Sequence, residues 1–335
     1  MLSRVANNLY WLARYIERAE NLSRLIKTHE EALTDLVWSG EEDTSSSWRS
    51  LLEVTALEEV YDEIQEDLDH PCEIPEFLSV LPAHTNSIFS CFSHARENAR
   101  AVRDQISEEM WLNLNAAYID LRDQGRSLWK ESPASFCDLV IRQCLLFHGV
   151  TDATISHGDP WSFIQLGRYL ERADKTSRFL DIPHFIPEPN RNVIWPTVVR
   201  ACGALSNYRQ RYPGDVTAHH STSLLVFSST FPRSVRFCLR QVNQVLRRVS
   251  NSPAHYTYSN EAERLAGSLL SRLDFAGENE IAKLGLHGYL DTVQIGLNAI
   301  GMELANAYFQ IDAPEPSNFN PMPRTNSQFQ TQSFS

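Results

Sequence analysis

The hydrophobic residues of this chain follow the period of an α-helix almost throughout its length. Two stretches carry the pattern most clearly, with apolar positions three, four or seven residues apart and a serine completing the stripe. The first stripe is Leu9, Leu12, Ile16, Ala19, Ser23 and Ile26, and the second is Phe163, Leu166, Leu170, Ala173, Ser177 and Leu180. Such spacing marks one buried face of an amphipathic helix.

The same period predicts helices over most of the remaining chain. We expect them near 48–66, 86–105, 107–126, 134–149, 192–211, 230–249, 259–274 and 278–309. Prolines at 183, 187 and 189 end the second striped helix, and Tyr212-Pro213-Gly214-Asp215 is a strong turn signal. Alternating strand patterns are nearly absent; the best of them, Leu224–Ser228, is too short to assign. The predicted fold is an all-α bundle of about ten helices.

The two striped stretches are copies of one another. Arg14-Tyr15-Ile16-Glu17-Arg18-Ala19 returns 154 positions later as Arg168-Tyr169-Leu170-Glu171-Arg172-Ala173, and Ser23-Arg24 returns as Ser177-Arg178. A repeat at this period predicts two duplicated halves, about 1–150 and 151–312, within one helical domain of 1–312. A weaker echo, Arg100-Ala101-Val102-Arg103 against Arg233-Ser234-Val235-Arg236, follows the stronger one in each half. Residues 313–335 are rich in Pro, Ser, Asn, Gln and Thr and predict a disordered tail.

Each striped helix also carries a charged stripe on its opposite side. Arg14, Glu17, Asn21 and Arg24 fall together there, and an isolated helix would simply expose them to water. The repetition of these charges favours specific partners instead. In one interpretation Arg14, Glu17, Arg168 and Glu171 form an internal ion-pair network. In the other, arginines face a pocket and bind a carboxylate or phosphate. The anion-binding candidates are Arg14, Arg18, Arg96, Arg100, Arg103, Arg168, Arg172, Arg233 and Arg236.

Composition narrows the functional classes. A formal net charge of −12 and a pI near 5.4 argue against a general nucleic-acid or anionic-membrane binder. Only four of the 30 basic residues are lysine, and guanidinium groups suit bidentate contacts with carboxylates. The six cysteines show no Cys-x-x-Cys spacing, no signal peptide is recognisable, and no apolar run is long enough to cross a bilayer. These features predict a cytoplasmic protein with reduced thiols.

Familiar catalytic and cofactor motifs are missing. The sequence contains no phosphate-binding glycine loop, nucleophile elbow or His-Glu-x-x-His, so no cofactor and no metal are predicted. The paired Glu-x-x-His motifs of di-iron bundles are also absent, the nearest approaches being Asp67-x-x-His70 and Asp181-x-x-His184. Further candidate site residues are Asn98, His157, Trp161 and His287. Glu17 and Glu171 are the candidates for a general base.

Several ordered motifs resemble the bacterial alpha-E domain family. They are Leu2–Trp11 with Arg14–Asn21, Ala95–Arg103, Trp161–Asp174, Phe231–Val235 and Gly285–Leu290, and the resemblance spans roughly residues 1–311. It implies an all-α fold of uncharacterised role, encoded or fused beside circularly permuted ATP-grasp proteins and transglutaminase-like proteins. That association implies peptide or amide-bond chemistry, with an ATP-grasp amidoligase-like or transglutaminase-like partner and a peptide or acidic small-molecule ligand.

Three hypotheses therefore stand. The first is a substrate-binding or co-catalytic component of an ATP-grasp-linked ligation system. The second is a stand-alone enzyme acting on amide bonds, with Glu17 or Glu171 as base and arginines stabilising an oxyanion. The third is a structural scaffold whose ion pairs hold the two halves together.

Overall fold

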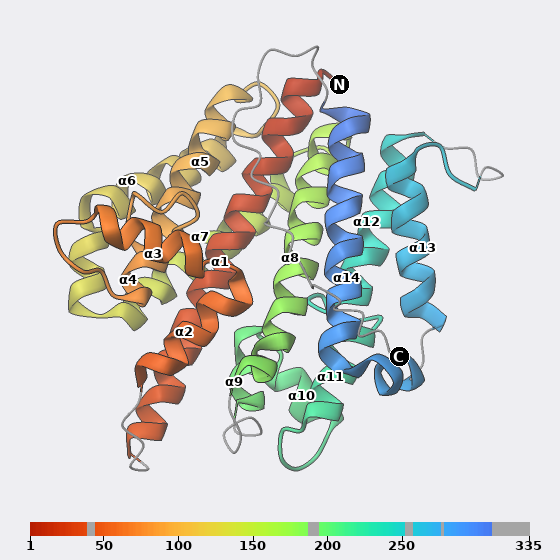
Figure 1. Ribbon diagram of the computed structural model, residues 1–335. Coiled ribbons are helices and arrows are strands. Elements are labelled where there is room, and N and C mark those ends of the chain that lie inside the picture. The colour runs from red at the N-terminus through yellow and green to blue at the C-terminus, as the bar shows by residue number, and fades with distance from the viewer. Residues whose placement is uncertain (39–43, 187–193, 252–256, 276–277, 310–335) are drawn as a thin grey trace, which may run out of the picture.

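Two long helices form the centre of the molecule. The computed structural model describes residues 1–38, 44–186, 194–251, 257–275 and 278–309. Within it, α1 (Ser3–Trp38) and α8 (Asp159–Phe185) run side by side through the middle (Figure 1). Every residue of both predicted apolar stripes is at most 3% exposed. The buried faces predicted from the sequence are thus confirmed, and both belong to a single hydrophobic core.

The two central helices approach each other very closely at Gly167. A Cβ atom on this glycine would lie 2.2 Å from the carbonyl oxygen of Tyr10 and 3.2 Å from the Cβ of Ala13. Only a residue without a side chain allows this approach. The contact lies one helical turn before Glu171, so it also sets the distance over which charged side chains can reach across.

Each central helix carries its own group of helices. Helices α5 (Ile88–Ala101) and α7 (Pro133–Thr154) pack on α1, with α6 (Glu108–Glu131) against both. Helices α12 (Val235–Val249) and α14 (Glu278–Tyr308) pack on α8, with α13 (Glu261–Phe275) against both (Figure 1). The shorter helices are α2 (Thr44–Thr55), α3 (Glu58–Asp67), α4 (Ile74–Ser79), α9 (Trp195–Ala201), α10 (Leu205–Arg211) and α11 (Ala218–Phe227).

Helices α5 and α12 begin in the same way. Ser87 caps α5 by accepting a hydrogen bond from the Ser90 amide (3.2 Å), and Ser234 caps α12 by accepting one from the Phe237 amide (3.1 Å). The residue before each cap, Asn86 or Arg233, therefore projects from a fixed helix start. Arg100 instead lies in the last turn of α5. The predicted echo between Arg100–Arg103 and Arg233–Arg236 was therefore wrong as a match of equivalent positions.

The all-α class is confirmed, and the described residues contain no strand. They contain fourteen helices rather than about ten, because two predicted helices are broken and two short ones were not predicted. The helix expected over 48–66 is interrupted at Ala56 (φ 54°), and that over 192–211 at Gly203 (φ 62°), where the backbone turns left-handed. Helix α4 was unexpected, and Leu224–Ser228 belongs mostly to α11. The predicted tail, 313–335, lies outside the described residues. None of the described helices combines the length and apolarity needed to cross a membrane.

Candidate functional site

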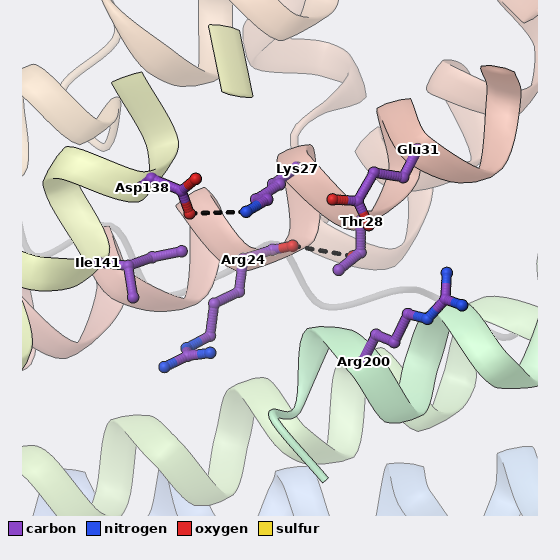
Figure 2. Close-up of a pocket in the computed structure, with 7 residues that line it drawn as sticks. All are labelled: Arg24, Lys27, Thr28, Glu31, Asp138, Ile141 and Arg200. Carbon is purple, nitrogen blue, oxygen red and sulfur yellow. Dashed lines mark hydrogen bonds and ion pairs between the residues drawn. The ribbon is translucent and has the colours of Figure 1, made fainter. Parts of the chain in front are cut away.

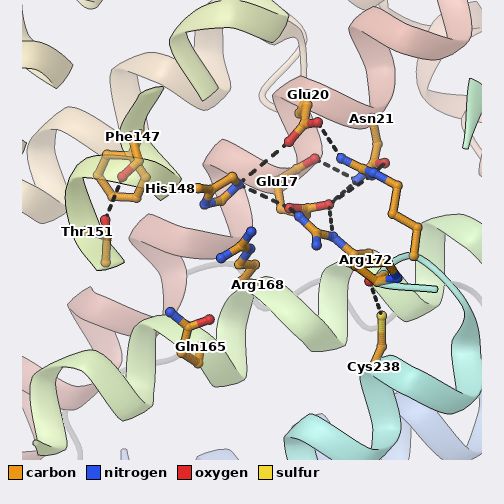
Figure 3. Close-up of polar contacts among 12 residues, drawn as sticks. Glu17, Glu20, Asn21, Phe147, His148, Thr151, Gln165, Arg168, Arg172 and Cys238 are labelled. Carbon is orange, nitrogen blue, oxygen red and sulfur yellow. Dashed lines mark hydrogen bonds and ion pairs between the residues drawn. The ribbon is translucent and has the colours of Figure 1, made fainter. Parts of the chain in front are cut away.

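The charged residues of the two repeat copies meet between α1 and α8 and exchange partners. Arg18 on α1 donates to Glu171 on α8, with Nε 2.7 Å from Oε1 and Nη2 3.2 Å from Oε2. Arg172 on α8 donates to Glu17 on α1, with Nε 2.8 Å from Oε1 and Nη2 2.7 Å from Oε2 (Figure 3). Each glutamate is held by the arginine that follows the other glutamate in its copy.

Both glutamates are fully buried, which makes these bonds energetically important. Burial alone raises the pKa of Glu17, but Arg172 and Arg233 outweigh it and hold that pKa well below its ordinary value. Burial likewise raises the pKa of Glu171, and Arg18 and Arg14 lower it to below its ordinary range. Removing one partner of such a buried pair costs about 3–5 kcal/mol, because the other charge is left desolvated and unpaired.

Each crossed pair is built on a Glu-Arg dipeptide, one in each copy of the repeat. A family model described as a predicted alpha-helical domain with a conserved ER motif matches residues 1–309. The chain belongs to the Alpha-E family. Its two Glu-Arg dipeptides, Glu17-Arg18 and Glu171-Arg172, are called here the ER quartet.

The chain also matches longer bacterial proteins of unknown role. Uncharacterised proteins of Mycobacterium bovis and Mycobacterium tuberculosis are 25% identical over 343 residues, which is 95% of this chain but 38% of each relative. The chain thus spans well under half the length of these curated relatives. No solved structure gives a significant match.

Glu171 is surrounded by cations. Arg14 Nε lies 2.7 Å from its Oε2 and also donates through Nη1 to the Tyr10 hydroxyl at 2.9 Å. Lys175 Nζ lies 3.7 Å from its Oε1. Arg18 completes its bonding by donating to the side-chain oxygen of Asn86 at the start of α5. The carboxylate is therefore saturated and has no free lone pair directed at solvent.

Glu17 is surrounded by different groups. Arg233, at the start of α12, donates to Glu17 Oε1 (3.2 Å), to Asn21 Oδ1 (2.9 Å) and to Glu20 Oε1. Asn21 in turn donates to Glu17 Oε1 at 3.1 Å. Arg24 contacts Glu20 Oε1 at 2.9 Å. Of the two predicted anion-binding arginines that follow α8, Arg233 thus reaches the ER quartet and Arg236 does not.

Arg168 breaks the symmetry of the arrangement. It stands 154 positions after Arg14, yet its closest carboxylate contact among the described residues is Asp152 Oδ2, 3.5 Å from Nη1. Its Nε is buried and has no hydrogen-bond partner in the described part of the chain. Burial lowers the pKa of this guanidinium, and the neighbouring Arg172 lowers it further. By the repeat, Arg168 would pair with Glu17 as Arg14 pairs with Glu171. Glu17 is instead bound by Arg172 and Arg233.

One buried histidine faces two of these carboxylates. His148 Nε2, on α7, lies 3.2 Å from Glu17 Oε2 and 3.6 Å from Glu20 Oε2, and neither His148 Nε2 nor Glu20 Oε2 makes a well-aligned hydrogen bond (Figure 3). The three side chains could reach a common metal ion. However, Arg172, Arg233 and Arg24 already neutralise both carboxylates, so the local charge opposes a divalent cation.

A polar pocket opens next to this network. It has a volume of about 260 Å³ and is lined by Arg24, Lys27, Thr28, Glu31, Asp138, Ile141 and Arg200 (Figure 2). Lys27 pairs with Asp138 at 2.7 Å. Arg200, on α9, forms no ion pair with any residue in the described part of the chain, which leaves its charge directed at solvent. Arg24 belongs both to the pocket wall and, through Glu20, to the buried network.

The other predicted arginines lie elsewhere, so the structure does not gather them around one pocket. Arg96 donates to Asn115 (2.8 Å) and lies over the Tyr118 ring, and Arg103 lies over Trp111. Arg100 is exposed and pairs with Glu97 at 2.7 Å, whereas Arg236 pairs with Asp274 at 2.6 Å. These guanidinium groups instead contact aromatic, amide or acidic side chains next to them. Asn98, on the same helix as Arg96 and Arg100, is half-buried, and its side chain makes no hydrogen bond with the described residues.

His157 and Trp161 form a small surface group around Asp152. His157 stacks on Trp161 with ring centroids 4.3 Å apart, and the Trp161 indole donates to Asp152 Oδ1 at 3.1 Å. Gln165 donates to the same oxygen. Because Asp152 also contacts Arg168, this group forms the outer end of the charged network. His287 lies apart from it, against Asp181 near the end of α8.

Sequence reasoning did not identify several important residues. Glu20 and Asp174 stand 154 positions apart, and each pairs with the arginine four residues later, Arg24 or Arg178. They fall inside the repeated segment, one position after Ala19 and Ala173, so a comparison of charge as well as identity would have found them. His148 and Asp152 are on α7, outside the repeated segment, and nothing in their local sequence signals their contacts.

Proposed function

We propose that this Alpha-E domain is a non-catalytic, substrate-binding component of an ATP-grasp-linked peptide or amide-ligation system. The observation that supports this most is the polar pocket beside the ER quartet, because its wall carries three basic side chains, of which Arg200 has no acidic partner among the described residues. Amide ligation joins a carboxylate to an amine, so its substrates carry carboxylates that Arg24, Lys27 and Arg200 suit. The longer mycobacterial relatives, in which the segment matching this chain is 38% of the length, are consistent with a domain that works beside another unit.

A catalytic role for the ER glutamates is less well supported. A general base needs an accessible lone pair and a pKa near the working pH. Glu17 and Glu171 are each 0% exposed, and both carboxylates have a pKa held below the ordinary range. Their arrangement favours a structural role for the ER quartet, which joins the scaffold hypothesis to the binding hypothesis.

The duplication of the chain is part of the same proposal. The crossed bonds of the ER quartet, the equivalent pairs Glu20–Arg24 and Asp174–Arg178, and the matched caps Ser87 and Ser234 support two related halves. In this account the halves diverged around the quartet. Arg233 and His148 joined the first glutamate, and Arg14 and Lys175 joined the second.

Binding of a glutamate pentapeptide tests the pocket. Isothermal titration calorimetry should detect binding to the wild-type domain and at least about tenfold weaker binding to Lys27→Gln/Arg200→Gln, since each lost charge contact contributes about 1.5 kcal/mol or more. Arg122→Gln is the matched control, because Arg122 pairs with Asp123 on an exposed surface. Equal affinity of both variants for the peptide, or no binding to the wild type, would exclude the pocket.

A second experiment tests the partner. Co-expression of the domain with a circularly permuted ATP-grasp protein should give a complex on size-exclusion chromatography, and the domain should stimulate ATP hydrolysis in the presence of acidic peptide. Absence of both complex and stimulation would contradict the ATP-grasp link, whatever the pocket binds.

A further inference from the structure

A second cluster of titratable side chains lies at the far end of α8. Asp181 is in the last turns of that helix, ten residues beyond Glu171 and therefore about 15 Å along the axis. His287 and Asp291 lie one turn apart on α14, facing Asp181. The ER quartet does not include this cluster, and the pocket described above is lined by residues of α1, α7 and α9 instead.

Asp181 holds the imidazole of His287 in a defined orientation. Both of its carboxylate oxygens lie close to His287 Nδ1, at 2.9 and 3.0 Å. The Asp181 side chain is 7% exposed, whereas those of His287 and Asp291 are 37% and 50% exposed. An ionised carboxylate only accepts hydrogen bonds, so the imidazole proton lies on Nδ1 and the lone pair of the neutral ring lies on Nε2.

That lone pair faces another acceptor. His287 Nε2 lies 3.5 Å from Asp291 Oδ2, and within the described residues no lysine or arginine pairs with either aspartate. Two carboxylates and a directed imidazole nitrogen thus surround a point at which positive charge is missing.

The spacing suits a metal ion. Histidine nitrogen and aspartate oxygen ligands lie about 2.0–2.2 Å from zinc, so two tetrahedral neighbours are separated by about 3.3–3.5 Å. The separation of His287 Nε2 and Asp291 Oδ2 matches that distance. A carboxylate that accepts the other ring proton is the usual support of a metal-binding histidine, and Asp181 occupies that position.

We propose that His287 Nε2 and the Asp291 carboxylate bind a divalent transition-metal ion, Zn²⁺ by ligand type, and that Asp181 is the positioning residue. Imidazole with carboxylate is a donor set for Zn²⁺ and its neighbours rather than for Ca²⁺ or Mg²⁺ alone. Two protein ligands leave coordination positions open to water or to a carboxylate ligand. The site is half-exposed, so such a ligand can reach it.

His184 provides an internal control. Its ring is parallel to that of His287, with centroids 3.9 Å apart and planes inclined by 4°. Its nitrogen lone pairs therefore lie in a parallel plane and do not point at the proposed ion. His184 packs against the ring of its neighbour, a role that phenylalanine can fill.

Metal titration tests the proposal directly. His219 and His220 are consecutive in the sequence and would bind metal ions adventitiously. The His219→Gln/His220→Gln variant therefore serves as the parent protein. At pH 7.5, calorimetry with Zn²⁺ and absorption spectroscopy with Co²⁺ should give one ion per chain. His287→Gln and Asp291→Asn should abolish binding, Asp181→Asn should weaken it about 10- to 100-fold, and His184→Phe should keep the stoichiometry.

Two results would overturn the proposal. The first is no stoichiometric binding by the parent, which would mean that a protonated His287 bridges the two aspartates. The second is unchanged binding in both His287→Gln and Asp291→Asn, which would identify an adventitious ion only. Asp291 is half-exposed, so Asp291→Asn should fold normally, and a circular dichroism melt of each variant verifies this.

Discussion

Replacing Gly167 by alanine should force the two central helices apart. The added Cβ would lie 2.2 Å from the Tyr10 carbonyl oxygen, 3.1 Å from its carbonyl carbon and 3.2 Å from the Ala13 Cβ. The first of these is about 1 Å shorter than a van der Waals contact, and the neighbouring atom is backbone, which cannot rotate away. The helices must therefore separate where the ER quartet holds them together.

The magnitude follows from two opposing effects. Overpacking a well-packed interface costs about 1–3 kcal/mol, and more where backbone must move. Replacing glycine by alanine inside a helix contributes about 0.5–1 kcal/mol of stability. We expect a net loss of about 1–2 kcal/mol in the free energy of unfolding.

Gly149 supplies the control. It lies inside α7, and a Cβ there would meet nothing within 4 Å. Gly149→Ala should therefore gain about 0.5–1 kcal/mol from helix propensity alone. Urea unfolding followed by circular dichroism measures both variants. If Gly167→Ala is as stable as Gly149→Ala, the close approach of α1 and α8 is wrong.

Two further properties of the whole chain can be measured. The pKa of Asp174 is lowered to about 2, because Arg178 and Lys175 outweigh the effect of burial, and those of Glu17 and Glu171 are also depressed. Stability from these groups is complete above pH 5 and is lost as the pH falls toward 2, so the melting temperature should drop steeply below about pH 4, and a flat profile would contradict their pairing. All six cysteines are free and buried, and burial raises the pKa of the Cys202 and Cys238 thiols to about 12. A thiol reagent at pH 8 should therefore react slowly with the native protein and titrate six thiols in denaturant, whereas fast native labelling would refute their burial.

The sequence predicted the central pair of helices well, because the spacing of apolar residues that buries one helix face is a local property of the chain. A 3.6-residue period places Leu9, Leu12 and Ile16 on one face whatever surrounds them, and the repeat places Phe163, Leu166 and Leu170 likewise. The breaks at Ala56 and Gly203 depend on a left-handed turn of the backbone at a single residue. Their local sequence carries too weak a signal to show this.

The candidate site was predicted only in part for the same reason. Helical geometry put Arg14 and Glu17 on a shared face, but it could not say that Glu17 reaches Arg172 rather than a neighbour on its own helix. His148 has no repeat counterpart among the predicted residues, and His287 contacts Asp181 across 106 positions. Those contacts exist only after the tertiary fold brings the helices together.

The central claim is that the glutamates of the ER quartet are bound across the helix interface. Double-mutant cycles on urea unfolding measure this directly, using Glu17→Gln, Arg172→Met and Arg18→Met singly and in pairs. We expect a coupling of at least about 2 kcal/mol between Glu17 and Arg172, because the pair is buried and bidentate. We expect less than about 0.5 kcal/mol between Glu17 and the adjacent Arg18, because Arg18 bonds Glu171 instead. Similar weak coupling in both cycles would contradict the crossed arrangement.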